Sequence, residues 1–148
     1  MAEKRQESDD NKPSVYEVLS QHIGDVHYCV FKLKDYFDSL NDVVHYYLDK
    51  FGPYLPVRER TDLAILALEA DKLHIELSRI VYNMQVLRAR AQVHIDRGTV
   101  EDFSVPDEVV EELSNAVKEI EQKVYRFADH LNAFIHQIIE TAHREGIA

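Results

Sequence analysis

The sequence predicts an all-α protein, an elongated antiparallel three-helix bundle with coiled-coil-like heptad packing. Apolar residues recur in three long runs at alternating spacings of three and four, which is typical of helices that pack along their length. The 148 residues include only four glycines and four prolines, too few for the many turns of a sandwich or a barrel. Most of these breakers lie between or outside the three runs, so they separate a few long helices.

Length and local composition predict one domain preceded by a tail. A chain of 148 residues has the usual size of a single domain and can bury its own core. Residues 1–12 are polar, charged and without periodicity, which predicts a flexible charged tail. A single helical domain is therefore expected over residues 13–148.

Charge and cysteine content argue against several classes of function. The formal net charge of -10 disfavours a general affinity for nucleic acid or anionic membrane, because both need Lys and Arg to displace counterions. The single Cys29 excludes an internal disulfide framework and a cysteine-based zinc site. No apolar run is long enough to span a bilayer, and the first residues do not resemble a signal peptide. We therefore expect a cytoplasmic protein that does not bind membranes.

The first predicted helix covers residues 14–51. Ser14 and Glu17 have the spacing of a capping box, which predicts the helix start. Its a positions are Ile23, Val30, Phe37, Val44 and Phe51, and its d positions are Leu19, Val26, Leu33, Leu40 and Tyr47. Gly24 lies inside this run and weakens the helix by about 1 kcal/mol relative to Ala. Because the apolar spacing continues through it, we expect one long helix that ends before Gly52 and Pro53.

The second predicted helix covers residues 61–97. Thr61 and Asp62 form a plausible N-cap region, and Gly98 stands where a C-terminal glycine is expected. Its a positions are Leu63, Ala70, Leu77, Met84 and Ala91, and its d positions are Leu66, Leu73, Ile80, Leu87 and His94.

The third predicted helix covers residues 105–143. Ser104 is the expected cap, Pro106 suits the first turn, and Asp107 and Glu108 favour a helix N-terminus. Its a positions are Val110, Val117, Val124, Leu131 and Ile138, and its d positions are Leu113, Ile120, Phe127, Phe134 and Thr141. Short connections between helices of similar length favour antiparallel neighbours, and the 3.5-residue period favours left-handed packing.

The second helix has another apolar face, opposite its a and d positions. Its c and f positions carry Ile65, Leu68, Ile75, Tyr82, Val86 and Val93. Lys72 and Arg79 interrupt this row. A helix that is apolar on both sides is usually buried on both sides, so we predict an interface with a second copy or with another helical protein. Scattered surface aliphatics, or a broader fold with this helix at its centre, are the alternatives.

The most suggestive group of possible metal ligands is His136, Glu140 and His143. Their spacing places them on one helical face and includes the Glu-x-x-His pattern of di-iron bundles. Counted from Ile138 at position a, however, they occupy f and c positions and point to solvent. We therefore expect no internal metal site and no cofactor, and a metal-binding bundle remains an alternative.

Arg88 and His94 provide the only candidate catalytic pair. His94 is the one histidine at a seam position, and we expect it near His22 at one end of the bundle, as a hydrogen-bonded side chain or as part of a pH-sensitive or metal-binding pair. The Arg-x5-His spacing of Arg88 and His94 resembles the ribonuclease motif of the HEPN family of helical, dimerising proteins. The resemblance covers two residues and implies that they contribute to RNA cleavage. Ala89 departs from it, because a polar residue is more usual there.

These patterns together predict a non-enzymatic helical interaction protein that acts as an adaptor, a regulator or an assembly subunit. The sequence contains no glycine-rich phosphate loop and no nucleophile elbow. A HEPN-like ribonuclease and a metal-binding helical bundle are the alternative functions.

Overall fold

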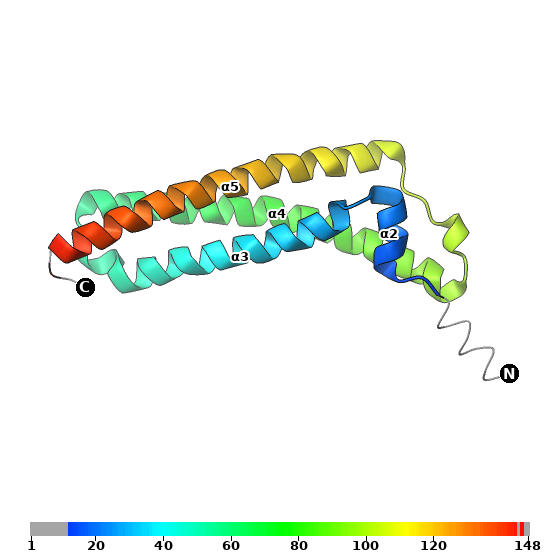
Figure 1. The fold of residues 1–148 in the computed structure, drawn as a ribbon, viewed down its shortest axis with the longest axis horizontal. Coiled ribbons are helices and arrows are strands. Elements are labelled where there is room, and N and C mark those ends of the chain that lie inside the picture. The colour runs from blue at the N-terminus through cyan, green and yellow to red at the C-terminus, as the bar shows by residue number, and fades with distance from the viewer. Residues whose placement is uncertain (1–11, 145, 147–148) are drawn as a thin grey trace, which may run out of the picture. The chain divides into compact units, whose positions relative to one another are not determined.

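The computed structural model describes residues 12–144 and 146, and within them the chain is all-α, with no strand. The expected tail over residues 1–12 lies outside the described residues apart from Lys12. The helices are α2 (Val15–Ile23), α3 (Val26–Phe51), α4 (Val57–Arg97) and α5 (Asp107–Arg144), with short 3-10 turns η1 (Gly52–Tyr54) and η2 (Val100–Asp102) (Figure 1). None of these helices is long and apolar enough to cross a membrane.

The described residues form two compact units. The first, called the α2 unit, contains residues 12–31 and 80–117. The second, called the η1 unit, contains residues 32–79 and the described residues from 118 onward. Helices α3, α4 and α5 each contribute one segment to each unit. The expectation of one domain over 13–148 stays a prediction.

The first predicted helix is divided at Gly24, so the expectation of one helix over 14–51 is wrong at this point. Ser14 caps α2 as predicted, because its hydroxyl accepts a hydrogen bond from the backbone N–H of Glu17 at 3.1 Å. Gly24 ends α2 with φ 63° and ψ -142°, and its N–H donates to the carbonyl of Ser20. Such a conformation is open to glycine and costly for other residues. The heptad pattern does not record it, since Ile23 and Val26 keep their spacing across the break.

Helix α4 begins at Val57, four residues before the predicted start. The carbonyl of Pro56 accepts a hydrogen bond from the backbone N–H of Arg60 at 2.9 Å, so the first turn forms directly after this proline. Thr61 is not the N-cap. Its hydroxyl donates instead to the carbonyl of Val57 at 2.8 Å, inside the helix.

Phe103 organises the end of the α2 unit. It follows η2, is only 2% exposed, and contacts the ring of His22 at 5.0 Å and the ring of His94 at 5.9 Å between centroids. The guanidinium of Arg90 lies 5.9 Å from the centre of the same ring. Because His22 belongs to α2 and His94 to α4, this one side chain joins the short helix to the end of the long one.

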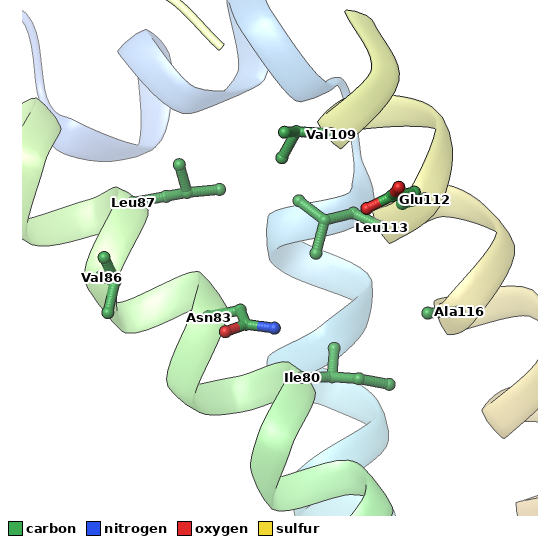
Figure 2. A pocket seen from close by; sticks show the side chains of 8 residues that line it. All are labelled: Ile80, Asn83, Val86, Leu87, Val109, Glu112, Leu113 and Ala116. Carbon is green, nitrogen blue, oxygen red and sulfur yellow. The ribbon is translucent and has the colours of Figure 1, made fainter. Parts of the chain in front are cut away.

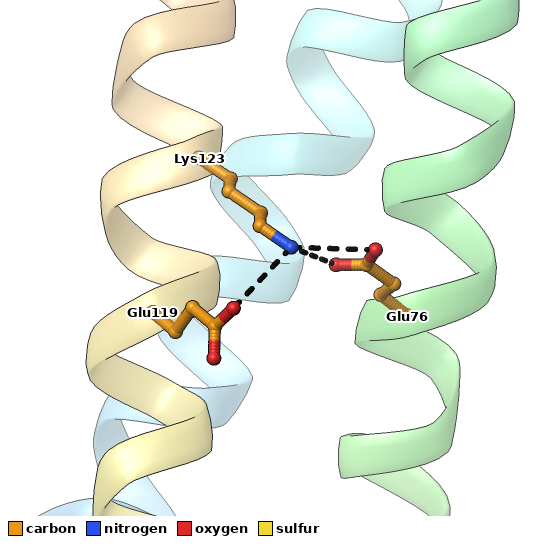
Figure 3. Close-up of polar contacts among 3 residues, drawn as sticks. All are labelled: Glu76, Glu119 and Lys123. Carbon is orange, nitrogen blue, oxygen red and sulfur yellow. Dashed lines mark hydrogen bonds and ion pairs between the residues drawn. The ribbon is translucent and has the colours of Figure 1, made fainter.

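In the η1 unit, segments of α3, α4 and α5 pack against one another. Phe37 of α3 is fully buried and lies near His74 of α4 and Phe127 of α5, with ring centroids 6.4 and 6.3 Å apart. Figure 3 shows an ion pair across the surface: Lys123 Nζ of α5 lies 3.1 Å from Glu76 Oε2 of α4 and 3.6 Å from Glu119 Oε1. The hydrogen bond to Glu76 is the main cause of the raised pKa of Lys123.

The predicted heptad positions form the interior of both units. Every a position of the three predicted runs is buried except Val110, which is half-buried. The d positions are buried apart from four half-buried ones, which are Val26, Leu40, Tyr47 and His94. The spacing of apolar residues therefore identified the inward-facing residues of each helix.

Candidate protein-binding face of helix α4

In the η1 unit, the outer side of α4 exposes three aliphatic side chains. Ile65, Leu68 and Ile75 are between 51 and 61% exposed. The neighbouring seam residues Leu63 and Ala70 are fully buried, so the helix buries one side and leaves apolar groups in water on the other. Water contact with large aliphatic groups is unfavourable, and several such groups exposed on one side of a helix are typical of an interaction site.

In the α2 unit, the remaining part of α4 likewise has one buried side and one side with exposed apolar residues. Tyr82, Val86 and Val93 are between 41 and 65% exposed. Met84 and Ala91, at the seam of the same segment, have no exposed surface. All six residues predicted at the c and f positions are thus exposed, and together they define the α4 face: Ile65, Leu68, Ile75, Tyr82, Val86 and Val93.

A hollow of about 370 Å³ lies beside this part of the α4 face, between α4 and α5 of the α2 unit. Figure 2 shows Leu87 of α4 and Leu113 of α5 extending toward it. Its lining residues are mostly aliphatic: Ile80, Asn83, Val86, Leu87, Val109, Glu112, Leu113 and Ala116. With a single carboxylate and a single amide, the lining suits an aliphatic side chain of a binding partner better than a polar substrate. Val86 belongs to both the hollow and the α4 face.

The candidate metal ligands lie on the outside of α5. His136, Glu140 and His143 are all exposed, which agrees with their f and c heptad positions. Within the described part of the chain, no three His, Cys, Asp or Glu side chains are grouped so that they could hold a metal ion. This helix therefore offers solvated polar side chains at these positions.

The candidate catalytic pair occupies two different environments on α4. Arg88 is exposed, whereas His94 is half-buried and its Nδ1 shares a hydrogen bond with Thr99 Oγ1 at 2.8 Å. Six residues along a helix correspond to a rise of about 9 Å and a rotation of about 240°, so the two side chains leave the axis in different directions. His94 and His22 lie at the same end of the α2 unit, as expected, because both rings contact the ring of Phe103.

His27 is a buried titratable residue that sequence reasoning missed. It is 6% exposed, it contacts the rings of Tyr16 and Phe31, and neither ring nitrogen has a hydrogen-bond partner among the described residues. Burial, and then the positive charge of Arg88, lower its pKa. The heptad pattern places it at position e, beside the seam. The break at Gly24 separates α2 from α3, and the spacing of the apolar residues does not predict this break.

Comparison of the chain with known proteins finds no matching family model, no matching curated protein and no matching solved structure.

Proposed function

We propose that this protein is a non-enzymatic helical interaction protein, an adaptor, regulator or assembly subunit, whose α4 face binds a helix of another polypeptide. In this proposal the chain is an elongated antiparallel three-helix bundle with heptad packing. The a and d positions supply its interior, and the c and f positions of α4 supply its binding surface. The observation that carries the proposal is the exposure of all six residues of the α4 face.

The energetics favour a covered face over a solvated one. Burying one Val, Leu or Ile side chain completely contributes about 1.5–3 kcal/mol. Six side chains that are about half exposed therefore leave on the order of 5 kcal/mol to be gained on association. Helix α4 extends over 41 residues, which at 1.5 Å per residue gives about 60 Å of helix for a partner to follow. A second amphipathic helix matches such a surface in length and shape.

The test compares two disruptive substitutions with a matched control. Ile75→Glu with Val86→Glu places charges on the α4 face, whereas Ile139→Glu places one on α5 at a residue as exposed as Val86. Light scattering after size exclusion, with identification of any stoichiometric co-purifying chain, measures association. We expect the wild type and Ile139→Glu to associate and the double variant to be monomeric. A monomeric wild type without a stoichiometric partner would contradict the proposal.

A further inference from the structure

Charges beside the α4 face are segregated along the helix. The g positions, which flank the face on one side, read Asp62, Glu69 and Glu76 in the first half of α4. In the second half they read Asn83, Arg90 and Arg97. One end of the row is therefore acidic and the other end is basic, although the whole chain has a net charge of -10.

We propose that the partner of the α4 face is a second copy of this chain, with the two α4 helices running antiparallel. This inference rests on the proposed function and names its partner. Flanking charges set the orientation of paired helices. A parallel copy in register would set this g row against the b row of the other helix, in which Asp71 is the only charged residue, so Arg90 and Arg97 would meet no acid. An antiparallel copy places Asp62 opposite Arg97 and Glu69 opposite Arg90, and two-fold symmetry forms each pair twice.

The antiparallel alignment that pairs these charges also places apolar residues of the two copies opposite one another, to within about 3 Å along the helix axis. Leu68 lies opposite Val93 of the second copy, and Ile75 lies opposite Val86 of the second copy. Near the two-fold axis, Arg79 lies opposite Tyr82 of the second copy, where a guanidinium can rest on the aromatic face. Arg79, which interrupts the apolar row in one chain, thus gains a partner in the pair.

The charged groups are available for these contacts. Asp62, Glu69 and Arg97 form no ion pair with another described residue. Glu76 already accepts from Lys123, and in this register it faces the neutral Asn83 of the second copy. The guanidinium of Arg90 lies over Phe103, and its edge N–H groups can still donate to a carboxylate.

Charge exchange in the full-length chain tests the pairing. Glu69→Arg and Arg90→Glu each create two repulsive contacts per dimer, so each should raise the dimer Kd about tenfold or more, and the combined variant should recover most of that loss. Glu111→Arg changes an exposed acid on α5 and should leave the Kd unchanged. Sedimentation equilibrium measures the Kd. Single variants that dimerise like the wild type, or a combined variant weaker than both, would overturn the proposal.

Cysteine cross-linking tests the orientation, in a Cys29→Ser background with a copper(II) oxidant. In the antiparallel pair, the two copies of position 79 are offset by three residues, or about 4.5 Å along the axis. The two copies of position 65 are about 46 Å apart. Arg79→Cys should therefore form a disulfide-linked dimer and Ile65→Cys should not. Equally rapid cross-linking at position 65 would overturn the antiparallel arrangement.

Failure of this inference is distinguishable from failure of the proposed function. A wild-type chain that is monomeric alone, yet co-purifies with a different protein in a manner that Ile75→Glu and Val86→Glu abolish, overturns the second copy as partner. The same result supports the α4 face as a binding surface.

Discussion

The side chain of His27 lies inside the α2 unit without a hydrogen-bond partner among the described residues for its ring nitrogens. Burial and the nearby Arg88 lower its folded-state pKa below the ordinary value of 6.5. Below about pH 6.5 the unfolded chain therefore takes up a proton at this residue before the folded chain does, and the free energy of unfolding falls. Above that pH the imidazole is neutral in both states and contributes no pH dependence.

His27→Leu should remove this part of the acid sensitivity, because leucine fills the site without a titratable group. Urea unfolding of both proteins between about pH 5 and 7.5 measures the effect. We expect the stability of the wild type to decline more steeply than that of the variant as the pH falls. Parallel stability curves would show that burial of His27 is not coupled to folding.

Phe103 connects α2 and α4 at the end of the α2 unit. Its ring contacts two histidines and one arginine, and it is almost fully buried. Phe103→Ala should lower the free energy of unfolding by about 3–5 kcal/mol, through lost burial and the cavity left behind. Tyr54→Ala, at a residue that is 65% exposed, should change stability by less than about 0.5 kcal/mol. Similar midpoints of chemical denaturation for the two variants would contradict this role.

Gly24 ends α2 and separates it from α3. A side chain at this position meets no atom within 4 Å, so the cost of a substitution comes from the positive φ and not from a clash. Gly24→Ala should therefore lower the free energy of unfolding by about 1–3 kcal/mol. Thermal unfolding followed by circular dichroism measures the change.

Gly52→Ala is the matched control for this substitution. Gly52 has no positive φ, and an added Cβ would make an ordinary contact with Leu48 at 3.6 Å. Its effect should stay within about 1 kcal/mol. A Gly24→Ala variant at least as stable as the wild type would show that α2 and α3 can join into one helix, as the heptad pattern suggests.

At the level of elements, the sequence predicted which residues face inward better than where helices begin and end. The heptad positions are an average over a whole helix, so residues such as Phe37, Leu77 and Val124 could be placed in the interior from their spacing alone. The break at Gly24 and the early start after Pro56 depend on single backbone conformations. Apolar spacing does not contain that information.

For the whole molecule, the sequence predicted the α4 face and left its occupant open between a second copy of the chain and another helical protein. The outward orientation of residues such as Ile75 and Tyr82 follows from their heptad positions, and the structure leaves them exposed. The partner that covers this face can be inferred from the sequence of one chain only through surface features that the partner must complement. The acidic-to-basic order of the g positions from Asp62 to Arg97, beside this face, is such a feature.

Thiol alkylation in the native assembly tests the central claim, that the α4 face is covered by another chain. In a Cys29→Ser background, Ile75→Cys places a thiol on the α4 face, and Ile139→Cys places one on α5 at a residue that is also exposed. We predict that maleimide modifies the thiol at position 75 about tenfold more slowly than the thiol at position 139 until denaturant is added. Equal rates at the two positions in the native assembly would contradict the claim.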